Sequence, residues 1–510
     1  MNASDHRVIV GQTGQNVMGL AIGAIATLAA QVLITNALGD EAFGVVTLTT
    51  QAAFIAATAT RFGMDVANVR LVAILAGRDQ VASARRLVRR SVTVAAAVSV
   101  PFAVAAYLAS GWLAEGFTAV PEVAEPAFRA AAVTVPFAAL AFVYMGATRG
   151  LKIMRYTLYS QWIVQPIGWI VLAGAFWTVS ESAGMATLAF GASWALALGI
   201  AFAGWEREQR RFPAGGVAGD GIAEERAGAL VRFGGLRAPA TLFSQLIFWT
   251  DLFVLSILWS GRGPAGAAQV GVYGAVLRAG QALFLFLTSV SLTFSPFVAD
   301  LHHRRERERL DALFKNVTRW TMAATIPVLL VLGILPRETL RIFGSEFTGG
   351  ADALRILIVG MIVPVTVGTV GFILIMAGRT GWDLVVYLGG FVIDVGVALA
   401  LAGPARLGIR GAAIAQALTL SFSATARLLL VRRFLRIWPF DRAWFRLVVP
   451  AVLGASTMGL AHALVPDDRW LVDLVVSAAA GVGIYVAATI VVGLLPTERA
   501  ALGRLISRRR

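Results

Sequence analysis

Long apolar runs, separated by short polar or Gly- and Pro-containing connections, dominate the chain from Val17–Leu38 onward. A bilayer core is crossed by about 20 apolar residues in a helix. On this basis we predict about fourteen membrane-spanning helices, centred near residues 27, 53, 101, 137, 166, 194, 248, 280, 326, 363, 392, 419, 456 and 482. The pattern predicts an all-α polytopic membrane protein.

An internal repeat joins the first six spans to the next six. The segment Ala42–Gln51 opens the second span much as Gln269–Arg278 opens the eighth, and each is followed by a basic connection and a Pro-containing span. Six spans is an even number, so the two lobes share one orientation in the membrane. This is the plan of a parallel-repeat transporter that handles its substrate between two lobes.

The repeat gives four predicted parts. They are an N-terminal lobe at 1–205, a cytoplasmic linker at 206–236, a C-terminal lobe at 237–436, and two extra spans with a basic tail at 437–510. Two basic connections, 65–90 and 300–319, are expected to form amphipathic helices along the inner membrane surface.

Charge supports this topology. Most of the 44 Lys and Arg residues fall in connections that the span count places on one side, and the positive-inside rule assigns that side to the cytoplasm. Both termini are then cytoplasmic, and we expect a multi-pass membrane protein. The net charge of +15 thus reflects topology and attraction to anionic membrane lipids rather than nucleic-acid binding.

Composition narrows the chemistry. Hydrophobic residues make up 58% of the chain and charged residues 14%, and there is no Cys. The four His residues are expected in tails or loops, and no hydrolase, P-loop or zinc-protease motif occurs. We therefore predict no enzyme activity, no catalytic residue, no metal site and no cofactor beyond coupling to H⁺ or Na⁺.

One face of the second span is polar. Helical spacing aligns Thr47, Gln51, Phe54, Thr58 and Arg61. Such a stripe either lines a water-filled cavity or makes hydrogen bonds between helices. Gln51 and Arg61 are candidate substrate-binding residues, although Arg61 is also close enough to the inner boundary to reach the interface.

Asp251 and Arg278 lie on consecutive apolar segments. Counted from Ser260 and Gln269, both would sit about 13 Å from the turn. Ionisable groups in a membrane are costly and point to function by default. They either form a structural pair, or Arg278 with Gln281 binds an anionic head group while Asp251 carries a proton or Na⁺.

Three further polar residues lie in later or neighbouring spans. Asp394 is a second ion-coupling candidate, with Tyr387 seven residues earlier on the same face. Gln161 and Gln165 share a face of the fifth span and are candidate contacts for a sugar or head group. Packing between helices explains each of them equally well.

Several motifs carry a family resemblance. They are Leu38–Gly44, Arg61–Met64 followed by Arg70–Ala73, Asp251, Val270–Tyr273 and Ser295–Phe297. In this order and spacing the chain resembles the Wzx-like oligosaccharide flippases of the multidrug/oligosaccharidyl-lipid/polysaccharide exporter superfamily. The resemblance runs through about the first twelve spans.

The resemblance implies a V-shaped, two-lobed alternating-access carrier. It would move a polyprenyl-diphosphate-linked oligosaccharide to the outer leaflet for polysaccharide or lipopolysaccharide assembly, alongside polymerase machinery. It also implies a basic cavity for the diphosphate, with Arg61 and Arg278 at the matching positions.

Two other functions stay open within the superfamily. Fourteen spans is similar to the lipid II flippases, whereas many saccharide flippases have twelve. A cation-coupled multidrug exporter is the other alternative, although Arg278 in the cavity argues against it. A membrane glycosyltransferase would need a large catalytic loop, and no predicted outer loop exceeds about 20 residues.

Overall fold

The computed structural model describes residues 3–76, 80–151, 153–210, 238–303, 306–368, 370–376 and 379–493, which are helical or irregular and include no strand. The chain divides into two compact units. The first comprises 1–274 with 395–409, and the second comprises 275–394 with 410–510. The predicted linker at 206–236 lies mostly outside the described residues, as does the tail from residue 494, so the four-part division stays a prediction.

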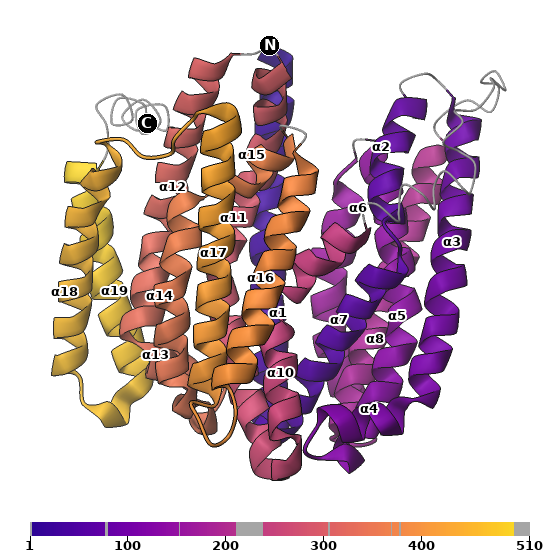
Figure 1. The fold of residues 1–510 in the computed structure, drawn as a ribbon, viewed down its shortest axis with the longest axis horizontal. Helices are drawn as coiled ribbons and strands as arrows, with labels where there is room; N and C mark the ends of the chain where they lie inside the picture. Colours follow the sequence, from indigo (N-terminus) through magenta and orange to yellow (C-terminus); the bar gives the residue numbers. More distant parts are fainter. Residues whose placement is uncertain are drawn as a thin grey trace. The chain divides into compact units, whose positions relative to one another are not determined.

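The first unit contains the following helices (Figure 1): α1 (Ala3–Thr60), α2 (Met64–Ala76), α3 (Val81–Leu108), α4 (Ser110–Phe117), α5 (Pro121–Gly150), α6 (Arg155–Thr157), a π-helix (Leu158–Val164), α7 (Gln165–Trp177), α8 (Ala183–Gln209), α10 (Thr250–Trp259), a 3₁₀-helix (Ser260–Arg262) and the start of α11 (Pro264–His303).

The second unit contains the rest of α11 and the following helices: α12 (Arg307–Ile334), α13 (Pro336–Arg341), a 3₁₀-helix (Ser345–Gly350), α14 (Ala351–Val367), α15 (Val370–Met376), α16 (Thr380–Leu401, whose end belongs to the first unit), α17 (Ile409–Leu435), a 3₁₀-helix (Trp444–Leu447), α18 (Val448–Leu464), a 3₁₀-helix (Asp467–Arg469), α19 (Trp470–Ala488) and a π-helix (Thr489–Gly493).

The helices account for the predicted spans. Ten helices of the described chain are long and apolar enough to cross a membrane, and a pair bent by 57°, Ala238–Leu246 with Thr250–Arg262, makes eleven. Helix α1 holds the first two predicted spans, because Gly39 breaks it with a φ of 77°. Helix α11 and the segment 155–177 hold the remaining two. The prediction of an all-α polytopic membrane protein is confirmed.

Helix α5 occupies the centre of the first unit and contacts α1, α2, α3 and α8. Small residues allow these close approaches. A Cβ on Gly146 would meet the backbone of Asp65 in α2, and one on Gly150 would meet Val72. Helix α2 is thereby held firmly against α5, and this contact positions the residues at the end of the second span.

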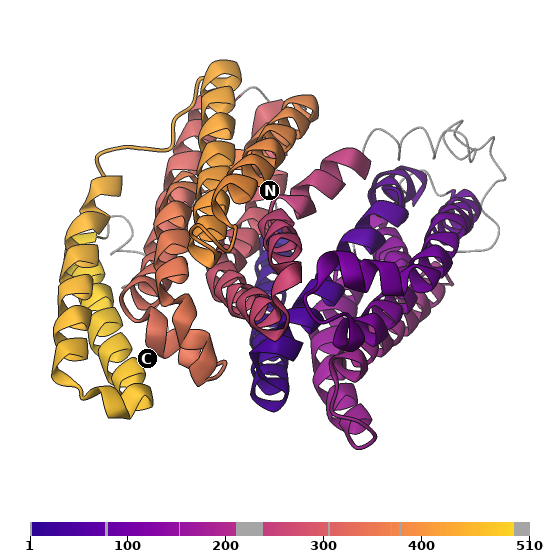
Figure 2. The ribbon, with the colours of Figure 1, turned by 60° about the horizontal axis from the view of Figure 1, so that its bottom comes forward.

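In the second unit, α18 and α19 form a hairpin, seen side by side in Figures 1 and 2. Gly454 and Gly481 let the two helices approach closely. The hydroxyl of Tyr485 donates a hydrogen bond to the carbonyl of Ala323 in α12, at 2.6 Å, and ties the hairpin to the rest of the unit.

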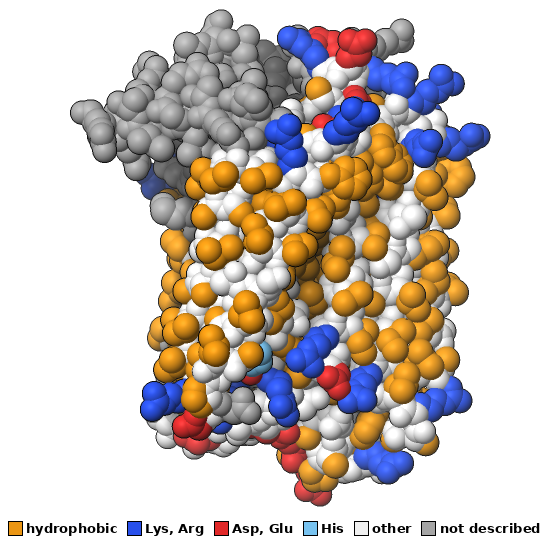
Figure 3. Space-filling view, turned by 90° about the vertical axis from the view of Figure 1, so that its left-hand side faces the viewer, with side chains coloured by type: hydrophobic (Ala, Val, Ile, Leu, Met, Phe, Trp, Pro, Cys, Tyr) orange, Lys and Arg blue, Asp and Glu red, His pale blue; other side chains and the backbone are white. Residues whose placement is uncertain are grey.

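Apolar side chains cover the outside of this hairpin. Leu460 and Leu464 of α18 and Val475 of α19 are among those more than half exposed. Figure 3 shows apolar side chains over the middle of this face and charged side chains gathered towards its two ends. This distribution is that of a lipid-facing surface.

The prediction of two amphipathic surface helices is half right. Residues 64–76 form the separate helix α2, but residues 81–90 simply begin α3. In the second unit, residues 300–303 end α11 and residues 307–319 begin α12, so a separate helix is wrong there. Most of each basic stretch therefore belongs to the end of a long span, and only residues 64–76 form a helix of their own.

Candidate functional site

A tight turn places Arg61 at the end of the second span. Helix α1 ends at Thr60, and the chain turns through Phe62 and Gly63, which have φ values of 52° and 69°. The N–H of Met64 then bonds the carbonyl of Arg61 at 3.0 Å. A positive φ is strained for a bulky residue, so the surrounding packing must hold this turn.

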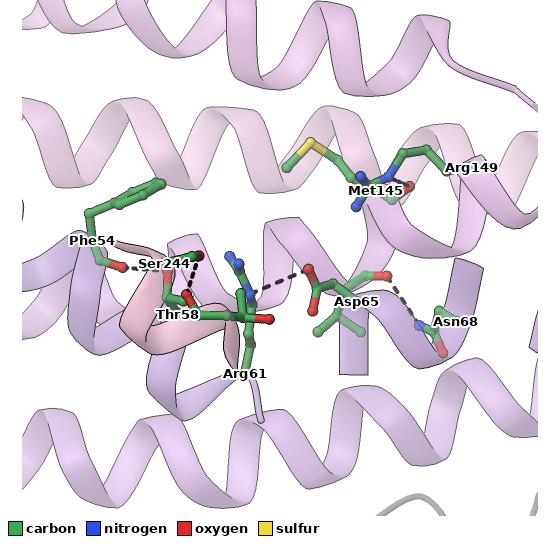
Figure 4. Close-up of polar contacts among 10 residues, drawn as sticks. Phe54, Thr58, Arg61, Asp65, Asn68, Met145, Arg149 and Ser244 are labelled. Atoms are coloured by element: carbon green, nitrogen blue, oxygen red, sulfur yellow. Dashed lines mark hydrogen bonds and ion pairs between the residues drawn. The ribbon is translucent and has the colours of Figure 1, made fainter. Parts of the chain in front are cut away.

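The Arg61 side chain is buried, with 6% of its surface exposed. Its Nε lies 3.4 Å from Oδ2 of Asp65, and both side chains are 8% exposed. Its guanidinium carbon lies 4.4 Å from the centre of the Phe142 ring on α5. Figure 4 shows Arg61 and Asp65 facing each other across the turn.

A second cation belongs to the same cluster. Arg149, on α5, lies close enough to interact electrostatically with both Asp65 and Arg61. Its Nε donates to the carbonyl of Met145 at 3.3 Å. Figure 4 shows Arg149 in the same neighbourhood as Arg61 and Asp65. Two guanidinium groups and one carboxylate give the cluster a net positive charge.

Some buried polar atoms of this cluster have no hydrogen-bond partner among the described residues. Within the described part of the chain, Nη1 of Arg61 and Oδ1 of Asp65 are buried and make no hydrogen bond. Buried polar atoms of this kind are costly and call for an explanation such as a ligand. A guanidinium with an open nitrogen above an aromatic ring is suited to a phosphate or carboxylate.

Helix α2 is fixed independently of that ion pair. Asn68 is fully buried; its amide donates to the carbonyl of Val143 at 3.1 Å and its Oδ1 accepts from Ser91 at 2.7 Å. These bonds join α2 to α5 and α3. The Asp65 carboxylate is therefore positioned by a rigid support.

The polar stripe of the second span is buried in protein. Thr47, Gln51 and Thr58 are each less than a tenth exposed, and the hydroxyl of Thr58 bonds the carbonyl of Phe54 at 2.9 Å. The Phe54 ring packs against Phe142 at 5.9 Å between ring centres. Gln51 stays a predicted substrate contact.

Asp251 lies at the break of the bent span. It occupies the first turn of α10, directly after the bend, and is fully buried. Its Oδ2 accepts a short hydrogen bond from the hydroxyl of Tyr273 in α11, and its Oδ1 accepts from the N–H of Leu252 at 2.9 Å. Sequence reasoning missed Tyr273 as a partner, although both residues were prominent in their motifs.

The depth argument for Asp251 and Arg278 needs correction. Helix α11 begins at Pro264 rather than at Gln269. Arg278 therefore lies more than a turn farther along its helix than the prediction assumed. The two residues belong to different units, so their pairing stays a prediction. Arg278 does contact the predicted neighbour Gln281, with Nη1 and Oε1 3.5 Å apart.

Asp394 is fully buried in α16, and the hydroxyl of Thr419 in α17 lies 3.4 Å from its Oδ1. The ring of Tyr387, predicted on the same face as Asp394, lies under Arg427, whose guanidinium carbon is 4.3 Å from the ring centre. Arg427 also donates to Oδ1 of Asp383 at 2.8 Å. Local sequence carries no signal for this largely buried pair, because its residues lie 44 positions apart on two different helices.

The two glutamines of the fifth span differ. The amide of Gln165 donates to the hydroxyl of Ser193 in α8 at 3.3 Å, so Gln165 serves helix packing. Gln161 lies in the π-helix and is partly exposed. π-helical turns are frequent at functional sites. Both residues stay predicted substrate contacts.

Comparison with solved structures identifies the fold. A lipid II flippase, MurJ, in an inward closed conformation matches with a TM-score of 0.67 and 14% identity over 94% of this chain and 98% of the other. An inward-facing multidrug resistance MATE family transporter of the MOP superfamily matches with a TM-score of 0.65 and 16% identity, over 82% and 98%. The fold is that of the MOP superfamily transporters.

Other comparisons agree with this fold. A MOP superfamily transporter from Pyrococcus furiosus, for which a binding pocket of reverse polarity is described, matches with a TM-score of 0.60 and 16% identity over 83% of this chain and 96% of the other. Residues 20–173 match the MatE family. No curated protein matches the sequence. The MOP fold agrees with the predicted superfamily, and the Wzx-like subfamily stays a proposal.

Proposed function

We propose that the protein is an alternating-access flippase. It moves a polyprenyl-diphosphate-linked oligosaccharide from the cytoplasmic to the outer leaflet, for assembly of cell-surface polysaccharide or lipopolysaccharide. The observation that carries this proposal is the buried Arg61 cluster, with its open Nη1, its aromatic support and Arg149 nearby.

The charge and the hydrogen-bond donors of the cluster suit this head group. A diphosphate offers several acceptor oxygens, and a guanidinium presents paired donors to them in one plane. The low-dielectric surroundings strengthen such contacts. Arg278 with Gln281 is the second proposed anion contact. Gln51 and Gln161 would bind the saccharide, and Gln165, whose amide donates to Ser193, would be a weaker contact. The polyprenyl tail would stay in the bilayer.

Asp251 and Asp394 are the proposed ion-coupling residues. Both are fully buried in membrane-spanning helices. Asp251 stands at the break of a bent span, and broken helices form ion and substrate sites in transporters. Protonation of Asp251 would change its bond to Tyr273, and the same holds for Asp394 and Thr419.

The proposed function also implies a cellular location and partners. We place the protein in a bacterial cytoplasmic membrane with both termini in the cytoplasm, next to the polymerase machinery that consumes its product. It is a carrier and not an enzyme. The solved structures with this fold are named as transporters or flippases, which supports that assignment.

Two further candidates have specific support. The match of residues 20–173 to the MatE family favours a cation-coupled multidrug exporter. The match to MurJ over 94% of the chain favours lipid II as the cargo. Lipid II also carries a diphosphate, so the Arg61 cluster serves both flippase proposals.

Translocation in proteoliposomes tests the proposal. Fluorescent polyprenyl-diphosphate saccharides with different glycans, lipid II among them, would be followed across the bilayer with and without H⁺ or Na⁺ gradients. We expect Arg61→Ala to abolish movement. Arg70→Ala, an exposed cation on α2, is the matched control and should transport normally. Asp251→Asn should remove the effect of the gradient.

The same vesicles separate the alternatives. If no diphosphate lipid moves and cationic dyes are exported instead, the protein is a multidrug exporter and the flippase proposal fails. If lipid II alone moves, the protein is a lipid II flippase. If Arg61→Ala transports as well as Arg70→Ala, the diphosphate does not bind at this cluster.

A further inference from the structure

The structure corrects the position of one histidine. His462 was expected in a loop, but α18 extends to Leu464 and includes His462 in its last turn. The ring faces α19, where Nδ1 of His462 lies 2.7 Å from Oδ2 of Asp473. A histidine next to a buried carboxylate inside a helix hairpin changes the expectation that the protein has no metal site.

Three elements of the second unit converge at this point. Glu338 comes from α13, His462 from α18 and Asp473 from α19, and one ligand atom of each lies within 4.8 Å of the others. Asp473 is buried, with 3% of its surface exposed, whereas Glu338 and His462 are partly exposed. The group is therefore accessible from one side and supported from the other.

A hydrogen bond fixes the buried carboxylate. The hydroxyl of Ser477, one turn along α19, donates to Oδ1 of Asp473 at 2.7 Å. This leaves Oδ2 for His462 or for a metal ion. Ligating carboxylates in metal sites are commonly oriented by such an outer hydrogen bond.

A histidine–aspartate hydrogen bond by itself does not explain Glu338. A second carboxylate beside a buried one is unfavourable unless a cation lies between them. Arg341, three residues after Glu338, has its guanidinium carbon 5.6 Å from the centre of the Trp470 ring. A protonated His462 or a bound cation would neutralise the cluster.

We propose that Glu338, His462 and Asp473 bind a divalent transition-metal ion, with Zn²⁺ as the best match. One imidazole and two carboxylates carry two negative charges, which the ion neutralises. Imidazole favours Zn²⁺ over Mg²⁺ or Ca²⁺, and three protein ligands leave a fourth position for water.

The distances suit such an ion. Zinc–ligand bonds of about 2.0–2.2 Å in a tetrahedral arrangement separate the ligand atoms by about 3.3–3.5 Å. The His462–Asp473 hydrogen bond would open by less than about 1 Å to admit the ion between them. The ion would then link α13 to both helices of the hairpin.

Zinc titration of the full-length protein in detergent tests the proposal. The protein would be stripped of metal and of any affinity tag, and binding would be measured by competition with a fluorescent chelator and by thermal unfolding. His302→Ala and His303→Ala would be present in every sample, because adjacent histidines also bind zinc. We expect one zinc ion per chain and a rise in unfolding temperature.

Glu338→Gln is the decisive variant. It leaves the His462–Asp473 hydrogen bond in place, so it should fold normally while its zinc affinity falls at least about tenfold and the thermal shift disappears. His462→Ala and Asp473→Asn should lose binding too. Glu346→Gln, an exposed carboxylate of the same unit, is the matched control and should bind zinc normally.

Two results would overturn the proposal. The first is the lack of saturable zinc binding by the protein that keeps Glu338, His462 and Asp473. The second is binding that Glu338→Gln leaves unchanged. Either result would reduce the group to a hydrogen bond between the two helices of the hairpin.

Discussion

The two units each bury an arginine against a carboxylate and an aromatic ring, and they differ in how completely the arginine is satisfied. In the first unit, Arg61 stands over Phe142 and its Nε is 3.4 Å from Asp65. In the second, Arg427 stands over Tyr387 and its Nε donates to Asp383 at 2.8 Å.

The difference is one of spare bonding capacity. Arg427 makes a short ion pair and also contacts the carbonyl of Ser423 at 3.4 Å through Nη1, leaving Nη2 without a hydrogen bond. Arg61 has only the longer ion pair, and both its Nε and Nη1 lack a hydrogen bond among the described residues. We therefore interpret the Arg427 cluster as structural and the Arg61 cluster as able to bind a ligand.

The largest effect should come from Arg427→Ala. It leaves Asp383 buried and unpaired, and breaking a buried pair costs about 3–5 kcal/mol. We expect a marked fall in unfolding temperature, measured by intrinsic fluorescence of the purified protein. Asp383→Asn added to Arg427→Ala should restore much of the loss, because the uncompensated charge is gone.

Arg61→Ala should lower the unfolding temperature much less. Asp65 keeps Arg149 nearby, and Asn68 still holds α2 in place. If Arg61→Ala unfolds as readily as Arg427→Ala, the first cluster is a structural pair like the second, and the comparison fails.

Arg61→Lys should have a smaller effect on transport than Arg61→Ala, and it separates the role of the positive charge from that of the guanidinium geometry. Lysine keeps the positive charge but loses the planar fork that grips a diphosphate. We expect transport to fall about 10- to 100-fold, or about 1.4–2.8 kcal/mol, with an unchanged unfolding temperature. Transport assays of Arg61→Lys and Arg427→Lys in the same vesicles measure this. Equal losses in the two variants would show that Arg61 has no special role.

Much of the fold could be predicted from local sequence. The lengths of apolar runs determine the spans, so the helices fall where hydropathy places them, including the hairpin of α18 and α19. The bounds are less certain, as the early start of α11 at Pro264 shows. Nothing between Pro264 and Gln269 breaks a helix, and the turn before it is shorter than the Gly-rich stretch implied.

The sites were predicted less well because they depend on contacts between distant segments. Asp383 and Arg427 are 44 residues apart, and Glu338, His462 and Asp473 come from three helices. The ion pair of Arg61 with Asp65 was also not predicted, although the residues are four positions apart, because the prediction places Asp65 in the separate surface helix at 65–90.

The smallest effect on transport should come from Gln161 and Gln165. These residues allow the same comparison between a side chain with and without a hydrogen bond, but with uncharged groups. The side-chain amide of Gln165 already donates a hydrogen bond to Ser193. Gln161 is partly exposed, and no hydrogen bond of its side chain is seen within the described residues. If a polar side chain without a hydrogen bond inside the protein marks a substrate contact, Gln161→Ala should lower transport by about three- to tenfold. This is the effect of losing one neutral hydrogen bond, which contributes about 0.5–1.5 kcal/mol.

Gln165→Ala should leave transport near the wild-type rate and cost only about 0.6 kcal/mol of stability, the average for a hydrogen bond between membrane helices. Initial rates with saccharides of different length would measure both variants, and the loss for Gln161→Ala should vanish when the saccharide is truncated. Should Gln165→Ala instead be the slower transporter, a satisfied hydrogen bond would no longer mark a structural residue. The reasoning that separates Arg61 from Arg427 would then have to rest on transport data alone.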